Sequence, residues 1–221
     1  MVMIRLIIFD LDGTLVDSSV DLTNALNYAT APYEIAQKTV QETKSLVGEG
    51  ITRLIEKLLG PEKSNIRQEV MDRFMEYYSA HLVDFTRAYD GVPEVLSMLH
   101  RYHKAVISNK RESLSRRVLL DLGLLHHFDA VLGSDSVGEK KPSPKPLLKV
   151  MEMFSCNPGQ TVIVGDSNFD VEAGKAAGIG TIAVSYGYRE ASLLRQADVI
   201  IARVQELPSA LERFGERGND P

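Results

Sequence analysis

The segment Ile7-Ile8-Phe9-Asp10-Leu11-Asp12-Gly13-Thr14-Leu15-Val16-Asp17 decides the fold. Its first residues complete an apolar run over residues 4–9, which predicts a buried strand of a parallel sheet. Asp10 and Asp12 follow directly, and residues i and i+2 of an extended chain point to the same side. Crowded carboxylates repel each other unless a cation or a shared proton relieves them. The segment therefore indicates a ligand site at the end of a buried strand, the alternative being a solvated acidic turn.

Composition excludes several classes of protein. The chain has 221 residues, 44% hydrophobic content and a net charge of −5, and this length allows one large or two small domains. The negative charge and the lack of a basic stripe argue against nucleic-acid binding. No apolar run approaches the ~20 residues of a membrane span, and Arg5 and Asp10 interrupt the N-terminal run, so no signal peptide is expected. The single cysteine, Cys156, excludes an internal disulfide and fits a cytoplasmic protein.

The stretch from about residue 18 to residue 85 is predicted to be helical. Ser18 or Ser19 is suited to cap its first helix, and apolar residues further on recur at spacings of three and four. These residues are Ile51, Leu54, Ile55, Leu58 and Leu59, then Val70, Met71, Phe74, Met75 and Tyr78. Gly48-Glu49-Gly50 and Gly60-Pro61 mark loops between helices.

Beyond about residue 90 predicted strands and helices alternate, which is typical of βαβ units and a parallel sheet. The helices are expected at 92–100, 114–122, 145–154 and 173–177, and the strands at 105–107, 128–132, 161–164, 181–184 and 199–201. The polar residues 215–221 are expected to fray. We therefore predict an α/β fold in which residues 1–17 and 86–221 form a doubly wound, Rossmann-like core. Residues 18–85 form a small inserted all-helical cap domain.

Polar residues follow four of the predicted strands, at the edge where open α/β sheets bind ligands. They are Asp10 and Asp12 after the first strand, Ser108-Asn109 after 105–107, Gly138-Glu139-Lys140-Lys141-Pro142-Ser143-Pro144 after 128–132, and Gly165-Asp166-Ser167-Asn168-Phe169-Asp170 after 161–164. Carboxylates, a hydroxyl with neighbouring backbone amides and a lysine are suited to hold Mg²⁺ and phosphate. The sequence therefore predicts a Mg²⁺ and phosphate site at this edge.

These segments resemble the four motifs of the haloacid dehalogenase-like hydrolases. The matching patterns are D-x-D-G-T at 10–14, a strand ending in Ser-Asn at 108–109, Lys-Pro-x-Pro at 141–144 and G-D-S-x-x-D at 165–170. The resemblance covers nearly the whole chain, because the helical block has the place of that superfamily's cap domain. Further features resemble its phosphoglycolate phosphatase branch, namely Asp17-Ser18, Asp21-Leu22, Ala25, Asn27 and Val47-Gly48-Glu49-Gly50.

The chemistry of ester hydrolysis and the family motifs assign the same roles to the acidic residues. Asp10 is expected to attack phosphorus and form an aspartyl-phosphate, while its other oxygen holds Mg²⁺. Asp12 is expected to protonate the leaving group and later to deprotonate water, and the family pattern implies that its backbone carbonyl binds the metal. Asp166 is the expected second carboxylate ligand. Asp170 is expected beside these ligands, holding a metal-bound water or Lys141.

The remaining motif residues are expected to supply hydrogen-bond donors and positive charge. Ser108 and the backbone amide of Asn109 are expected to hold phosphate oxygens. Lys141 is expected to lie next to Asp10 and the phosphate. Lys140 is the other candidate, and Lys141 is preferred because it directly precedes Pro142, as in the family motif. Seen alone, the two lysines also fit a solvated pair on a surface loop.

Further candidates bear on the reaction type and on the substrate. Thr14 stands where, by resemblance, hydrolases usually carry Thr and related phosphomutases carry Val, which favours hydrolysis. In the predicted cap, Gly48, Glu49, Gly50 and Arg53 are candidates for contacting the substrate. Their alternative is a turn between helices followed by a solvated helix face.

The sequence thus predicts a cytoplasmic, Mg²⁺-dependent phosphomonoesterase acting on a small phosphorylated metabolite, with 2-phosphoglycolate as the leading candidate. A sugar phosphomutase is one alternative, and a phosphatase or pyrophosphatase of the same superfamily with another substrate is the second. A non-catalytic phospho-acceptor module is the third, although such a module would not need a cap or the acid at Asp12. The sequence leaves a monomer and a homodimer equally open.

Overall fold

Strand β1 (Leu6–Phe9) lies at the centre of a six-stranded sheet in the computed structural model, which describes residues 3–216. The strand order is β5-β4-β1-β6-β7-β8, and every neighbouring pair is parallel. The other strands are β4 (His103–Ile107), β5 (Ala130–Leu132), β6 (Thr161–Gly165), β7 (Gly180–Val184) and β8 (Val199–Ile201). All four residues of β1 are buried, as its apolar sequence predicts.

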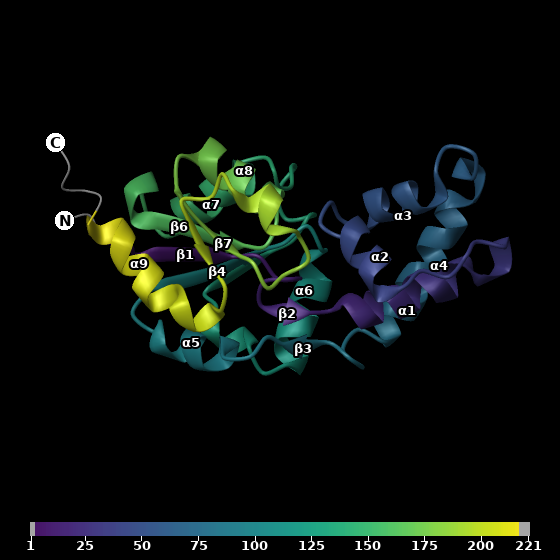
Figure 1. The fold of residues 1–221 in the computed structure, drawn as a ribbon, viewed down its shortest axis with the longest axis horizontal. Helices are drawn as coiled ribbons and strands as arrows, with labels where there is room; N and C mark the ends of the chain where they lie inside the picture. The colour runs from purple at the N-terminus through teal and green to yellow at the C-terminus, as the bar shows by residue number, and fades with distance from the viewer. Residues whose placement is uncertain (1–2, 217–221) are drawn as a thin grey trace.

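Helices cover both faces of this sheet (Figure 1). Ile7 and Phe9 of β1 belong to one buried cluster, whereas Leu6 and Ile8 belong to a second, because successive side chains of a strand point to opposite faces. Helices α5 (Val92–Met98), α6 (Glu112–Asp121) and α9 (Leu207–Glu216) lie on the first face, and α7 (Lys145–Met153) and α8 (Asn168–Ala177) lie on the second. The predicted doubly wound α/β fold is confirmed.

The segment between β1 and β4 contains the helical part of the molecule. It comprises α1 (Ser19–Thr30), α2 (Val40–Leu46), α3 (Ile51–Leu59) and α4 (Arg67–Ala80), with short 3-10 turns at Ala31–Tyr33 and Ser64–Ile66. Leu22, Leu54 and Phe74 from these helices belong to the same buried cluster as Ile7 and Phe9. The apolar periodicity of this stretch therefore arises from real helices with a shared core.

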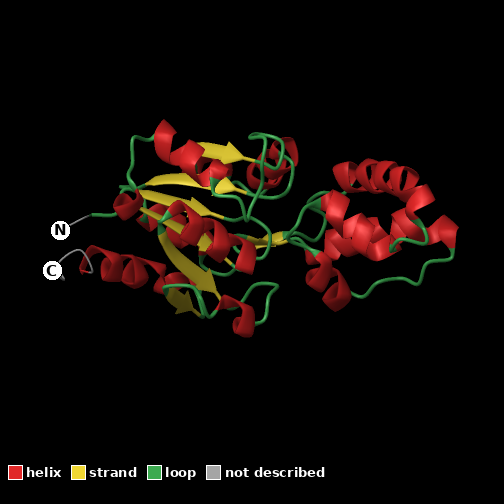
Figure 2. Ribbon diagram, turned by 90° about the horizontal axis from the view of Figure 1, so that it is seen from above, coloured by secondary structure: helices red, strands yellow, loops and turns green. Residues whose placement is uncertain are grey.

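A two-stranded antiparallel ribbon joins the two parts, which Figure 2 shows as separate lobes. It pairs β2 (Val16–Asp17) with β3 (Arg87–Ala88), so both chain connections pass through it. The domain boundaries predicted near residues 17 and 86 fall at this ribbon. Strands of two residues carry no periodicity, and for this reason the sequence did not predict them.

Several element bounds differ from the prediction. Helix α8 begins at Asn168, well before residue 173, because Ser167 and Asp170 form a capping box at its start. Helix α9 was not predicted, although its buried Leu207, Ala210 and Leu211 have helical spacing. The segment 215–221, predicted to fray, begins within α9, and its residues 217–221 lie outside the described residues. None of the helices described here is both long and apolar enough to span a membrane.

Candidate active site

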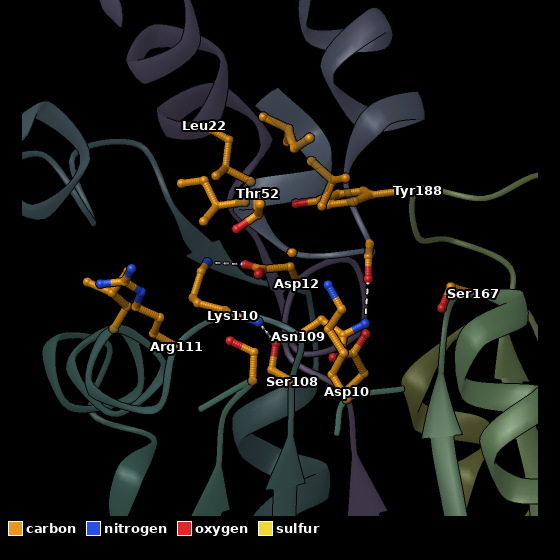
Figure 3. A pocket seen from close by; sticks show the side chains of 18 of the residues that line it. Asp10, Asp12, Leu22, Thr52, Ser108, Asn109, Lys110, Arg111, Ser167 and Tyr188 are labelled. Carbon is orange, nitrogen blue, oxygen red and sulfur yellow. Dashed lines mark hydrogen bonds and ion pairs between the residues drawn. The ribbon is translucent and has the colours of Figure 1, made fainter. Parts of the chain in front are cut away.

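A cavity of about 140 Å³ lies where the ends of the central strands face the helical part (Figure 3). Asp10, Asp12 and Asp166 line it from the ends of β1 and β6, and Ser108 lines it from the end of β4. Helices α1, α3 and α4 close it from the other side, with Leu22, Leu54 and Tyr78 among its walls. Predicted site residues from three separate strands thus line one cavity.

Three carboxylates meet beneath this cavity. Asp10, Asp166 and Asp170 each place an oxygen within 4.8 Å of the other two. Burial raises the pKa of Asp10 to about 7, although Lys141 opposes the shift, and burial together with Asp10 raises the pKa of Asp166 well above its usual value. Oxygen donors crowded in this way are the ligands that Mg²⁺ prefers, and a divalent cation would relieve their repulsion. The residues present therefore fit the predicted metal.

Glycines let the chain approach Asp166 closely. Gly13 has φ +85°, and a Cβ there would lie 2.3 Å from Asp166 Oδ2. A Cβ on Gly187 would lie 2.3 Å from Asp166 Cβ. The amide of Tyr188 donates to Asp166 Oδ2 at 2.7 Å, and Thr14 Oγ1 donates to Oδ1 at 3.5 Å. Backbone and hydroxyl donors thus fix the Asp166 carboxylate.

Lys141 links two of the three carboxylates. Its Nζ lies 2.9 Å from Asp10 Oδ1 and 2.6 Å from Asp170 Oδ1, and its side chain is 2% exposed. Although burial disfavours the ammonium, Asp10 and Asp170 raise the pKa of Lys141, so it stays charged. Asp170 Oδ2 in turn accepts from Ser167 N at 3.1 Å and Ser167 Oγ at 2.6 Å. The start of α8 therefore positions Asp170, and Asp170 positions Lys141.

The second aspartate of the first motif has a lysine of its own, Lys110. Lys110 Nζ lies 2.6 Å from Asp12 Oδ1 and donates to Tyr78 Oη of α4 at 2.8 Å. Asp12 Oδ1 also accepts from Ser18 Oγ at 2.5 Å. Burial disfavours the charged form of Lys110, but Asp12 and Tyr78 outweigh it and raise the lysine's pKa. Sequence reasoning missed Lys110, although it directly follows Ser108-Asn109 and its place in the chain was a usable signal.

Of the phosphate-binding candidates, Ser108 and Asn109 line the same cavity, whereas Lys141 lies behind Asp10. Ser108 is buried, and its Oγ accepts from the amide of Lys110 at 3.2 Å. Asn109 Nδ2 donates to the carbonyls of Gly48 and Lys141 at 2.8 and 3.0 Å. Its Oδ1 is buried without a hydrogen-bond partner among the described residues. Asn109 therefore connects the end of β4 both to the backbone of Lys141 and to the helical part.

Side chains of the α/β core donate hydrogen bonds to the backbone of residues 47–49, which we call the cap loop. Its carbonyls accept from Arg189 at Val47, from Asn109 at Gly48 and, at 2.5 Å, from Lys140 at Glu49. Lys140 thus contacts the cap loop, whereas Lys141 contacts Asp10 and Asp170. Just beyond the cap loop, Gly50 has φ +79°, and a Cβ there would lie 2.8 Å from the Asn109 carbonyl.

The four substrate candidates in the helical part divide into two pairs. Gly48 and Gly50 line the cavity. The side chain of Glu49 pairs with Lys57, and that of Arg53 with Glu56. Neither Glu49 nor Arg53 is among the residues that line the cavity. The structure therefore brings the glycines to the site and leaves both charged side chains outside it.

The order of these motifs around one parallel sheet, with helices inserted after the first, defines a class of enzymes. The model of the haloacid dehalogenase-like hydrolase family matches residues 7–184, a range that includes all four motifs. The chain therefore belongs to this family, as its motifs predicted, and it is an enzyme of the hydrolase class.

Similar proteins include several phosphoglycolate phosphatases. The chain is 39% identical over 186 residues to the phosphoglycolate phosphatase of Aquifex aeolicus, which covers 83% of this chain and 86% of that protein. It is 38% identical over 211 residues to the phosphoglycolate phosphatase of Chromobacterium violaceum, covering 92% and 95%. A solved structure of a predicted phosphoglycolate phosphatase from Haemophilus somnus has a TM-score of 0.86 at 28% identity, covering 94% and 97%. The predicted resemblance to this branch is confirmed.

Proposed function

We propose that the protein is a Mg²⁺-dependent phosphatase that hydrolyses 2-phosphoglycolate through an aspartyl-phosphate on Asp10. The observation that carries this proposal is the position of Asp10. Its carboxylate borders a small cavity, with Lys141 2.9 Å away and Asp12 beside it. The phosphoglycolate phosphatases among its relatives support the substrate.

In the first half-reaction Asp10 attacks phosphorus and the ester oxygen leaves. Asp10, Asp166 and the carbonyl of Asp12 would hold Mg²⁺, which supplies charge neutralisation between the anionic nucleophile and the anionic ester. Lys141 adds a fixed positive charge next to Asp10 Oδ1. Ser108 Oγ and the amide of Asn109 donate to phosphate oxygens and orient them for in-line transfer.

Asp12 carries the proton in both halves of the reaction. It protonates the departing alkoxide and then removes a proton from the water that attacks the aspartyl-phosphate. Ser18 and Lys110 hold its Oδ1, which orients the carboxyl group within the cavity. Hydrolysis rather than return of the phosphoryl group is supported by Thr14, whose hydroxyl lies against Asp166.

The helical part acts in this proposal as a cap domain, residues 18–85, that excludes bulk water and limits substrate size. A cavity of about 140 Å³ suits a small ester. A cytoplasmic location, with a monomer or a homodimer as the working form, stays a prediction.

Phosphate release from a panel of esters tests the proposal. The panel contains 2-phosphoglycolate, hexose phosphates, nucleoside monophosphates and pyrophosphate, each with Mg²⁺ and with EDTA. We expect Mg²⁺-dependent release that is fastest with 2-phosphoglycolate. A maximum with another ester would discard the substrate and keep the mechanism. Isomerised hexose phosphate without released phosphate would identify a mutase.

A further inference from the structure

Lys110 has an unused donor at the reaction site. An ammonium group has three N–H donors, and two of them are directed to Asp12 Oδ1 and Tyr78 Oη. The side chain is 6% exposed and belongs to the cavity wall, as Figure 3 shows beside Asp12. A buried ammonium with a remaining donor at a cavity is suited to bind an anion.

The other cations of this wall are differently placed. Lys140 and Arg189 donate to carbonyls of the cap loop, and Arg189 also donates to the carbonyl of Ser45. Arg111 is exposed at the rim and has no side-chain partner among the described residues. Lys110 is therefore the buried cation of the cavity wall that adjoins Asp12.

In a phosphorylated 2-hydroxy acid, the leaving group carries a carboxylate that would lie near Lys110. Asp12 must contact the ester oxygen in order to protonate it, and Lys110 Nζ is 2.6 Å from Asp12 Oδ1. In a phosphorylated 2-hydroxy acid the carboxylate carbon is two bonds from that oxygen, about 2.4 Å away. A carboxylate in this position reaches the surroundings of Lys110 without further extension of the substrate.

We propose that Lys110 selects the substrate by binding a carboxylate carried on the carbon of the scissile ester. This inference rests on the role proposed above for Asp12, and it assigns the substrate class as phosphate monoesters of short 2-hydroxy acids. Tyr78 holds Lys110 from the helical part, so selection depends on that part being in place.

The test compares two esters, 2-phosphoglycolate and ethyl phosphate. In ethyl phosphate a methyl group replaces the carboxylate, so this ester has one negative charge fewer. The measured quantity is the ratio of their kcat/KM values. For Lys110→Met we expect this ratio to fall about 10- to 100-fold, mainly through KM for 2-phosphoglycolate. Lys110→Arg should restore much of the ratio because it restores the charge. Misplacement of Asp12 would lower both kcat/KM values alike and leave the ratio unchanged.

Binding provides a second readout that is independent of turnover. In an Asp10→Asn background, calorimetry compares 2-phosphoglycolate with inorganic phosphate. Lys110→Met should weaken the binding of 2-phosphoglycolate about 10-fold or more and change the binding of inorganic phosphate little. If Lys110→Met fails to fold, Lys110→Gln keeps a donor without the charge and should show the same fall.

Two controls separate the possible failures. Arg53→Gln changes an exposed arginine outside the cavity and should keep the ratio. If the wild type prefers 2-phosphoglycolate but folded Lys110→Met keeps the same ratio of kcat/KM values, this inference alone is overturned. A large fall of that ratio in Arg111→Gln, and not in Lys110→Met, would also overturn it. A wild type that releases phosphate from other esters but not from 2-phosphoglycolate would overturn the proposed substrate as well.

Discussion

At the scale of single residues, each aspartate of the first motif faces its own buried lysine. Lys141 lies against Asp10 and Lys110 against Asp12. Removing one member of a buried pair leaves the other charge without compensation, which costs about 3–5 kcal/mol in proteins generally. Variants that keep shape but remove charge are therefore the appropriate probes of these pairs.

The role of Asp10 gives the first prediction. Asp10→Asn keeps the side-chain shape and removes the nucleophile, so phosphate release should fall at least about 1,000-fold. Release is measured with 2-phosphoglycolate at saturating Mg²⁺. Substantial activity in a folded Asp10→Asn would contradict the aspartyl-phosphate mechanism.

The raised pKa of Asp10 gives a second prediction, on the pH dependence of stability. Its folded-state pKa of about 7 lies above its ordinary value of 3.8, so the folded protein holds this proton more tightly than the unfolded chain. In EDTA, this group's contribution to stability should therefore fall as pH rises from about 4 to 7. Mg²⁺ should flatten the slope, because a bound cation favours the carboxylate.

Chemical unfolding at several pH values measures this slope. Asp10→Asn is the matched control, since the amide does not titrate, and its profile should lack the Asp10 contribution. Identical profiles for wild type and Asp10→Asn in EDTA would show that burial does not raise this pKa.

At the scale of elements, the central strands and the order of the motifs were predictable, because a buried parallel strand reads as an apolar run that ends in polar residues. The site residues at strand ends followed from this order. What the sequence did not reveal depends on tertiary contacts. The position of Lys110 after Ser108-Asn109 hinted at the site, but its contacts with Asp12 and with Tyr78 of a distant helix are visible only in the fold. Arg53 and Glu49 are drawn away from the cavity by local partners on their own exposed surface.

Gly50, at the start of α3, gives an element-scale prediction. Gly50→Ala would place a Cβ 2.8 Å from the Asn109 carbonyl at φ +79°, so α3 could not stay at the cavity. We expect kcat/KM to fall at least about 10-fold. Gly60→Ala, at the other end of α3, is the control. Its φ is +65° and its ψ −179°, with nothing within 4 Å of a Cβ there, so the change should cost about 1–3 kcal/mol of stability and little activity.

At the scale of the whole molecule, the two lobes are held together at two places. The ribbon of β2 and β3 connects them covalently, and the cap loop is held by Asn109, Lys140 and Arg189. Because all three side chains donate to backbone carbonyls, this contact depends on the loop's conformation rather than on its side chains.

Weakening that contact should favour an open arrangement. Lys140→Gln combined with Arg189→Gln should raise KM for 2-phosphoglycolate about 5- to 10-fold and speed amide exchange in residues 47–50. Arg203→Gln removes an exposed arginine that pairs with Glu206, and it should change neither. Unchanged exchange in the double variant would mean that other contacts hold the lobes.

The central place of β1 has a consequence for how the protein is made. This apolar strand is synthesised before its neighbours β4 and β6, which begin only at His103 and Thr161. The nascent chain must therefore carry an unpaired hydrophobic strand throughout synthesis of the helical part. We therefore expect chains stalled before β6 to expose β1 and to aggregate more readily than chains stalled after it.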